Sequence, residues 1–209
     1  MIVSIGEFRS RLLAQDLNSI NGKIIKINKN NKSIEIISMG HRNPQGLTID
    51  KDTNLIYSSE HGPKGGDEIN TIDTTKTIQN YGWPISSYGE HYGNEKKDNS
   101  KLYKIAPLFK SHKDYGFIEP TKNYTPSIGI SELILFDMLD QKILLASSLG
   151  NNVSEGDMSL HIYFFDKDNL KKYKSITLNE RIRDMLYLEK KNLIILFLES
   201  TSSIGVIKL

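Results

Sequence analysis

The chain has 209 residues, of which 38% are hydrophobic and 25% are charged, and its formal net charge is +2. This length predicts one domain with a single sizeable core, and the weak charge gives no support for a nucleic-acid partner. Cysteine is absent, which excludes disulfide bonds and cysteine-ligated metals.

The first residues, Met1–Ile5, have the pattern of a strand. They lack the basic start and the long apolar run of a signal peptide, so we expect no signal peptide on this chain. The longest dense apolar run, Leu193–Leu198, is far too short to cross a bilayer. We therefore predict no membrane span.

Short strand-like runs, broken by Gly, Asn and Asp, recur along the whole sequence and predict an all-β fold. A helical turn is expected only around Leu12–Leu17. The expected strands are Lys23–Ile27, Ser33–Ser38, Gly46–Asp50, Leu55–Ser59, Glu68–Asp73, Glu132–Asp137, Lys142–Ser147, Leu160–Phe165, Tyr173–Leu178, Arg181–Leu188, Leu193–Leu198 and Ile204–Leu209.

These strands form three similar units of three, which begin at Gly46, Glu132 and Arg181. In each unit the second strand is the most apolar, as a central strand should be. With a fourth, outer strand such as Tyr173–Leu178, antiparallel units of this kind are the blades of a β-propeller. A β-sandwich also contains many short strands and remains the alternative.

The units amount to about three and a half blades, whereas a closed propeller usually has about four to eight. We therefore expect the sequence to open in the middle of a blade, near a second strand. Residues 1–209 would then be a single, N-terminally truncated propeller domain, the C-terminal part of a longer protein.

The segment Trp83–Tyr124 has no clear strand pattern. It is either a functional cover or an irregular excursion with a few weak strands.

The stretch Gly40–Leu47 combines one cation and two amides with a rigid turn. Arg42 supplies a planar, permanently charged fork, and Asn43 and Gln45 supply donors and acceptors. Pro44 restricts the backbone and keeps these side chains out of a helix. Strand-like sequence follows at once, so the motif is expected on a loop that enters a sheet, where binding residues often lie.

A second cluster, Glu60–Asn70, is rich in glycine and carboxylates. An open backbone with Glu60, Asp67 and Glu68 offers hard oxygen ligands, which suit Ca²⁺ better than zinc or copper. Taken alone, the pattern is explained more simply by a glycine-rich turn with solvated acids.

Two further clusters are Asn80–Pro84, which holds the only tryptophan, and Glu180–Asp184. The first is most simply an aromatic plug beside a turn. In the second, Arg181 and Arg183 share one face if the segment is a strand. Two adjacent guanidinium groups indicate an anionic ligand in front of them, unless Glu180 and Asp184 neutralise them.

Together these clusters resemble the glucose/sorbosone dehydrogenase family, whose better-known members are soluble aldose sugar dehydrogenases that use pyrroloquinoline quinone (PQQ). The resemblance is spread over most of the chain, in the order of the family. The matching stretches are Ser4–Gly6, Ala14–Asp16, Gly22–Ile27, Gly40–Leu47, Glu60–Asn70, Asn80–Pro84, Tyr124–Ile128 and Glu180–Asp184.

The resemblance implies a six-bladed propeller with PQQ across its top face, and an oxidoreductase that oxidises an aldose sugar at C1. In such enzymes a histidine takes the proton of the anomeric hydroxyl while hydride passes to the quinone. Ca²⁺ and an arginine stabilise the developing negative charge. An external electron acceptor and a periplasmic or secreted location are also implied.

The resemblance further implies roles for ten residues of this sequence. Arg42 would be the catalytic arginine, and it would bind the cofactor together with Asn43, His61, Ser127, Arg181 and Arg183. The backbone carbonyls of Gly62 and Pro63 would hold the catalytic Ca²⁺, and Glu68 and Tyr81 resemble the ligands of a second, structural Ca²⁺.

The chain also departs from the family pattern. The catalytic histidine of the family lies upstream of the first strand here, and none of His41, His61, His91, His112 and His161 aligns with it. The lysine that grips the cofactor in the family is replaced by Gly150, and the usual Ala-Pro-Ser-Gly is replaced by Gly129–Glu132. We therefore expect this chain to be incomplete for catalysis. The alternatives are a non-catalytic propeller that binds carbohydrate or a protein, and a chain that needs a separate N-terminal half or a second copy of itself.

Overall fold

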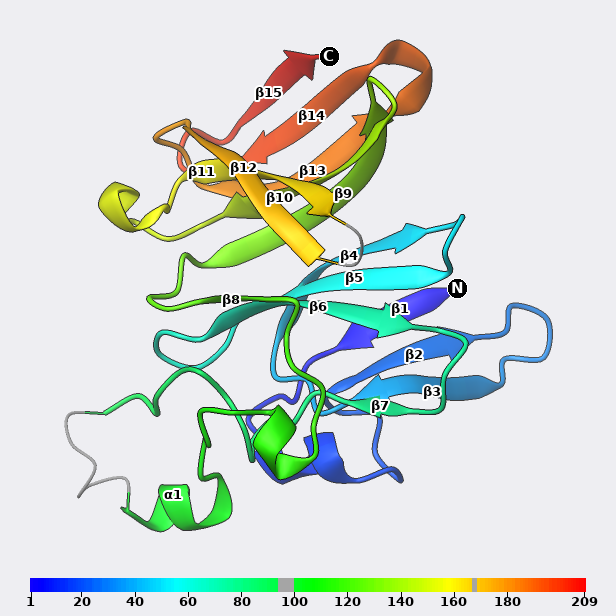
Figure 1. Cartoon of the computed structure of the whole chain (residues 1–209), viewed down its shortest axis with the longest axis vertical. Helices are drawn as coiled ribbons and strands as arrows, with labels where there is room; N and C mark the ends of the chain where they lie inside the picture. Colours follow the sequence, from blue (N-terminus) through cyan, green and yellow to red (C-terminus); the bar gives the residue numbers. More distant parts are fainter. Residues whose placement is uncertain (94–99, 167–168) are drawn as a thin grey trace.

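The computed structural model describes residues 1–93, 100–166 and 169–209, and these form an all-β protein with four sheets (Figure 1). The first sheet has the order β1 (Ile2–Ile5), β2 (Lys23–Ile27), β3 (Ile34–Met39) and β7 (Gln79–Asn80). The second has the order β4 (Pro44–Asp50), β5 (Leu55–Glu60), β6 (Asp67–Asp73) and β8 (Lys122–Tyr124).

The third and fourth sheets are simple antiparallel meanders. The third consists of β9 (Ile130–Met138), β10 (Gln141–Ser148), β11 (Ser159–Asp166) and β12 (Asn169–Thr177). The fourth consists of β13 (Ile182–Leu188), β14 (Leu193–Leu198) and β15 (Ser203–Lys208).

The predicted propeller architecture is confirmed, because each repeated unit forms one sheet and the sheets follow one another in sequence order (Figure 1). Their first strands are neighbours, with β4 beside β9 and β9 beside β13. The four sheets form an arc that does not close (Figure 1). One detail differs from expectation: the strand expected at Met1–Ile5 is the edge strand β1 (Ile2–Ile5). It has the position of a first strand, since it pairs with β2.

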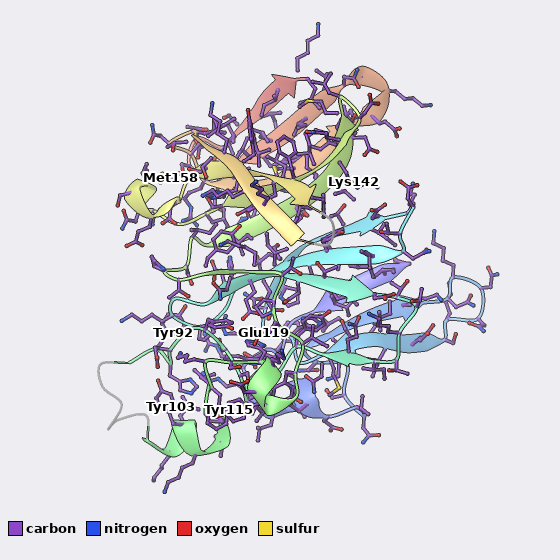
Figure 2. All side chains as sticks on the ribbon, viewed as in Figure 1. Tyr92, Tyr103, Tyr115, Glu119, Lys142 and Met158 are labelled. Atoms are coloured by element: carbon purple, nitrogen blue, oxygen red, sulfur yellow. The ribbon has the colours of Figure 1, made fainter. Side chains whose placement is uncertain are left out.

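Each pair of neighbouring sheets buries its own apolar layer. On β10, Ile143 and Leu145 face the fourth sheet, whereas Leu144 and Ala146 face the second. This alternation follows from the two-residue period of a strand. It explains why the central strands are continuously apolar: both of their faces are covered. At the start of β10, the Lys142 Nζ atom lies 2.7 Å from Asp50 Oδ1, and this ion pair links the third sheet to the second. Figure 2 labels Lys142.

The connection between β6 and β9 supplies the outer strands of the first two sheets. In addition to β7 and β8 it contains the short helix α1 (Ser100–Ile105) and a 3₁₀ turn at Lys113–Tyr115. Figure 2 shows Tyr92, Tyr103, Tyr115 and Glu119 on this segment, to one side of the sheets. The described part of this connection packs against the rest of the protein, because Trp83, Ala106 and Leu108 are buried.

The expected helical turn near Leu12–Leu17 is a 3₁₀ helix at Arg11–Gln15. No helix in the described residues is long and apolar enough to cross a membrane.

Candidate functional site

Most of the predicted site residues lie at one end of the strands. Arg42 precedes β4, Ser127 precedes β9 and Arg181 precedes β13, while His61 directly follows β5. In an antiparallel pair, the start of one strand and the end of the next lie at the same edge. The fold therefore gathers loops from the second, third and fourth sheets at one face.

Arg42, Asn43 and His61 are in direct contact. The Arg42 Nη1 atom donates a 2.8 Å hydrogen bond to the His61 carbonyl. The His61 backbone N–H in turn donates a 3.0 Å hydrogen bond to the Asn43 carbonyl. These two bonds fix the Arg42 guanidinium next to the loop that begins at His61.

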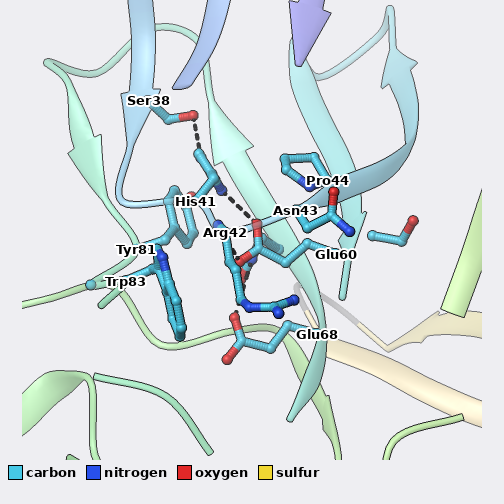
Figure 3. Close-up of polar contacts among 12 residues, drawn as sticks. Ser38, His41, Arg42, Asn43, Pro44, Glu60, Glu68, Tyr81 and Trp83 are labelled. Atoms are coloured by element: carbon cyan, nitrogen blue, oxygen red, sulfur yellow. Dashed lines mark hydrogen bonds and ion pairs between the residues drawn. The ribbon is translucent and has the colours of Figure 1, made fainter. Parts of the chain in front are cut away.

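A buried polar array lies directly behind Arg42 (Figure 3). Ser38 Oγ contacts His41 Nε2 at 2.8 Å, and His41 Nδ1 contacts Glu60 Oε2 at 3.0 Å. The other carboxylate oxygen of Glu60 accepts a 3.3 Å hydrogen bond from the Arg42 backbone N–H. The His41 ring also stacks on Tyr81, with ring centroids 4.9 Å apart.

All three members of this array are buried, with Ser38 and His41 0% and Glu60 3% exposed. The array therefore positions Arg42 rather than acting on a ligand itself. Sequence reasoning missed it, although His41 and Glu60 stand inside the two motifs. Nothing in the spacing of those motifs indicates that their side chains meet.

The Arg42 guanidinium lies 5.4 Å from the centre of the Trp83 ring, in cation–π contact. Burial lowers the pKa of Arg42 from its ordinary value, although Glu7 and Glu60 oppose this effect. The group remains a cation at any physiological pH. Arg42 and Asn43 line a cavity of about 420 Å³.

The loop from Gly62 to Gly66 is closely packed. A side chain at Gly62 would place its Cβ 1.6 Å from the Gly66 carbonyl oxygen. The Gly62 N–H donates to Asp67 Oδ1 at 3.2 Å, and the Pro63 carbonyl accepts a 3.1 Å bond from Gly66 N–H. Asp67 Oδ2 also accepts a 3.0 Å bond from Ile130 N–H. One carboxylate thus joins the predicted calcium loop to the third sheet.

Glu68 and Tyr81, the predicted ligands of a second Ca²⁺, lie on either side of His112. The His112 Nδ1 atom is 2.9 Å from the Tyr81 carbonyl, and Nε2 is 3.5 Å from Glu68 Oε1. Burial, with Glu60, Asp67 and Glu119 nearby, raises the pKa of Glu68 well above its ordinary value. A buried carboxylate among other acids suits a cation, and a carbonyl that accepts one hydrogen bond keeps a second lone pair. Both residues therefore fit the predicted role.

Arg181 and Arg183 come together on a carboxylate that the sequence did not single out. Arg181 Nη2 lies 3.2 Å from Glu199 Oε1, and Arg183 Nε lies 2.7 Å from Glu199 Oε2. Neither Glu180 nor Asp184 neutralises them: Glu180 Oε1 accepts from the Arg181 and Ser200 backbones instead. One carboxylate between two guanidinium groups leaves an excess positive charge.

Polar atoms without partners occur at two predicted cofactor positions. His61 Nε2 and Ser127 Oγ are buried, and neither has a hydrogen-bond partner among the described residues. The loop after Ser127 reaches Arg181, since Leu149 N–H donates to Gly129 and the Leu149 carbonyl accepts from Arg181. Buried polar atoms normally have partners, so these two fit a site that is completed by a ligand.

The predicted cofactor residues thus form two groups. Arg42, Asn43 and His61 form the first, and Arg181 and Arg183, near Ser127, form the second. Asp67 and the Ile130 backbone connect the loops of the two groups. No described group of three or more His, Asp and Glu side chains has a geometry that could hold a metal ion. A Ca²⁺ here would therefore depend on backbone carbonyls.

At Gly150, which stands at the position of the family's lysine, a side chain would have to displace the Asp157 carboxylate. A Cβ atom there would lie 2.0 Å from Asp157 Oδ2. That oxygen accepts a 2.6 Å hydrogen bond from the Asn152 backbone. The space beside Gly150 therefore holds an acid in place of a cation.

Glu132 is another residue whose importance sequence reasoning missed. Its Oε1 accepts backbone hydrogen bonds from Leu133 at 2.8 Å and from Leu47 at 3.3 Å, which links the second and third sheets. Burial raises the pKa of Glu132 to about 7, and the Asp184 carboxylate adds to the shift.

The sequence as a whole matches the model of the glucose/sorbosone dehydrogenase family over residues 1–204. The chain belongs to this family. It is 35% identical over 114 residues to the aldose sugar dehydrogenase YliI of Escherichia coli, a match that covers 48% of this chain and 30% of that protein. It is also 35% identical over 97 residues to quinoprotein glucose dehydrogenase B of Acinetobacter calcoaceticus, covering 41% of this chain and 20% of that one. The matched segments thus make up less than a third of the length of either relative.

Solved structures of sugar dehydrogenases share the fold of this chain. The apo-form of the soluble aldose sugar dehydrogenase from Escherichia coli superposes with a TM-score of 0.77 at 23% identity, covering 100% of this chain and 60% of that one. A glucose dehydrogenase structure superposes with a TM-score of 0.74 at 24% identity, covering 98% of this chain and 59% of that one. At these identities the likeness concerns the fold.

Proposed function

We propose that the propeller to which this chain contributes oxidises an aldose sugar at C1, with PQQ as oxidant and Ca²⁺ as its electrostatic partner. The observation that carries this proposal is the fixed position of Arg42, whose guanidinium is bonded to the His61 carbonyl beside the Gly62–Pro63 loop. A rigid cation next to oxygen ligands suits stabilisation of a developing negative charge.

When bound, PQQ supplies a quinone that takes up the C1 hydrogen of the sugar with its electron pair. In this proposal Arg42 provides positive charge at the quinone, and the carbonyls of Gly62 and Pro63 hold the Ca²⁺. Arg181 and Arg183 bind carboxylates of the cofactor, in competition with Glu199. We assign the acceptor of the sugar hydroxyl proton to no residue of this chain.

The unpartnered atoms of the site support the same proposal. His61 Nε2 and Ser127 Oγ lack hydrogen-bond partners in the described residues, as expected of atoms that contact a cofactor. Glu68 and Tyr81 are proposed to hold a second, structural Ca²⁺ through a carboxylate and a carbonyl oxygen.

The test is a titration of the protein with PQQ in the presence of CaCl₂, followed by aldose-dependent reduction of an electron-accepting dye. We expect saturable PQQ binding that requires Ca²⁺, and a loss of about tenfold or more in affinity for Arg42→Ala. Lys29→Gln, an exposed change of equal charge on the β2–β3 turn, should bind PQQ like the wild type. Absence of both cofactor binding and dye reduction would remove the enzyme proposal.

A second candidate function is a non-catalytic propeller that binds carbohydrate or a protein partner. It is favoured by Gly150, because a glycine beside the Asp157 carboxylate stands where the family has a cofactor-gripping lysine. Carbohydrate binding that is unaffected by PQQ and Ca²⁺, without dye reduction, would support this function over the enzyme.

The external electron acceptor and the periplasmic or secreted location remain part of the proposal and rest on family resemblance. Fractionation of the source cells, with detection of the protein in each compartment, tests the location.

A further inference from the structure

The loop that connects β1 to the first 3₁₀ helix forms one wall of the Arg42 cavity. Glu7 N–H donates a 2.9 Å hydrogen bond to the Arg42 carbonyl, which fixes the loop against the Gly40–Leu47 motif. The cavity of about 420 Å³ is lined by Glu7, Phe8 and Arg9 on one side and by Arg42 and Asn43 on the other. None of the proposed cofactor contacts uses the side chains of Glu7, Phe8 or Arg9.

A second hollow lies on the other side of Arg9. It has a volume of about 280 Å³, shares Arg9 with the Arg42 cavity, and is also lined by Arg11 and Leu13. Arg9 therefore stands between the two hollows, with Arg42 on one side and Arg11 on the other.

The charge around these hollows is predominantly positive. Three guanidinium groups, those of Arg9, Arg11 and Arg42, act electrostatically on the Glu7 carboxylate. In the part of the chain that the structure describes, neither Arg9 nor Arg11 forms an ion pair or a side-chain hydrogen bond. Glu7 is only 7% exposed, and its Oε2 has no hydrogen-bond partner in those residues. Glu60 also acts on Arg42, but it is already in contact with His41. The two carboxylates together do not balance three guanidinium groups, so an additional anion is favoured here.

The backbone of the loop is held in an uncommon conformation. Phe8 and Arg9 have φ values of 51° and 63°, in the left-handed region that is unfavourable for side chains of this size. The Phe8 ring is 75% exposed. Residues in such conformations often lie at ligand sites, and an exposed aromatic face beside arginines suits a sugar ring that carries a charge.

We propose that this loop selects an anionic aldose: Arg9 and Arg11 bind the carboxylate or phosphate of the sugar, and Phe8 lies against its ring. The inference rests on the proposed function, in which Arg42 lies at the quinone that takes up the C1 hydrogen. It adds the substrate class, a sugar that bears a negative group remote from C1. A planar guanidinium recognises carboxylate and phosphate by the same paired hydrogen bonds, so both kinds of sugar are tested.

The test measures binding to the cofactor-free protein. Trp83 is the only tryptophan and contacts Arg42, so its fluorescence reports on ligands in this cavity. We titrate with D-glucuronate, D-glucose 6-phosphate and D-glucose. At least one anionic sugar is expected to bind about tenfold or more tightly than D-glucose, and the preferred one identifies the group.

Arg9→Gln and Arg11→Gln should each remove most of this preference and leave D-glucose binding unchanged, whereas Arg9→Lys should restore part of it for the phosphate. Lys29→Gln, an exposed loss of the same charge, is the control and should keep the preference. Far-ultraviolet circular dichroism and the melting temperature establish that each variant is folded.

The proposal is overturned if the wild type binds all three sugars equally, or if Arg9→Gln and Arg11→Gln weaken D-glucose as much as the anions. It is also overturned if these variants weaken PQQ and not the sugars, because the guanidinium groups would then serve the cofactor. A protein that prefers anionic sugars but never binds PQQ refutes the proposed function and not the anion site.

Discussion

Glu60 contacts His41 through a 3.0 Å approach of its Oε2 to the imidazole Nδ1, while its other oxygen accepts from the Arg42 backbone (Figure 3). Because both contacts are buried, the carboxylate decides where Arg42 lies relative to His61. The relationship connects the two motifs of the sequence, since it joins the loop before β4 to the end of β5. The position of the proposed catalytic cation thus depends on an acid that contacts no ligand.

We predict that Glu60→Gln destabilises the protein by about 1–3 kcal/mol, because a buried imidazole and a backbone donor lose a charged acceptor. Urea unfolding measures the change. Glu35→Gln, on a side chain that is 69% exposed in a surface ion pair, is the control and should change stability by less than about 1 kcal/mol. Equal effects of the two substitutions would contradict the role given to the buried array.

Gly62→Ala should abolish the stabilisation by Ca²⁺. The added Cβ would lie 1.6 Å from the Gly66 carbonyl oxygen, so the loop must open and its carbonyls lose their places. Melting curves with and without CaCl₂ measure this effect. Gly65→Ala adds a methyl group that meets no atom within 4 Å, although its φ of +84° is strained. Gly65→Ala should keep the stabilisation by Ca²⁺. If both variants lose this stabilisation, backbone strain in the loop explains the loss, and the positions of the carbonyl ligands do not.

Glu132 should make stability depend on pH. Its folded-state pKa of about 7 is above the ordinary 4.5, so the folded protein holds a proton that the unfolded chain releases. This contribution is complete below about pH 4.5 and is lost as the pH rises through about 7. Glu132→Gln removes this titrating group. Between pH 4.5 and pH 8, the difference in unfolding free energy between the variant and the wild type should therefore shift in favour of the variant by about 1–3 kcal/mol. Gln keeps the Oε1 acceptor for both backbone donors. Parallel stability curves for the two proteins would refute the assignment.

The fourth sheet should cause self-association of the chain. Phe197 and Val206 lie on the same exposed face, 40% and 61% exposed, and β15 is an edge strand. An exposed apolar face and an unpaired edge are known causes of aggregation. Sedimentation velocity over a range of concentrations should show oligomers that Phe197→Lys with Val206→Lys reduces. Tyr173→Lys, on an exposed residue of β12, should not. A monomer at every concentration, with a cooperative melt, would contradict this prediction.

The strands were predictable from the sequence because their signals are local. Alternation, β-branched residues and turn residues occur within a few positions of one another, and β2 and β14 agree with the expected ranges residue for residue. The place of the first strand in its sheet was harder to predict. Whether Met1–Ile5 is a first or a second strand depends on its pairing with β2, beyond an intervening loop and a 3₁₀ helix.

The sequence by itself determined the all-β repeat and the motifs that identify the family, because both are recorded in the order and spacing of residues. Only the tertiary structure decided which charges meet: Glu199 joins Arg181 and Arg183, and Glu60 joins His41 and Arg42. The tertiary structure also decided that the Glu132 carboxylate accepts a hydrogen bond from the Leu47 backbone N–H, 85 residues away in the chain. The physical reason is that the strength of an ion pair or a buried hydrogen bond depends on distance and burial in space, which positions along the chain do not specify.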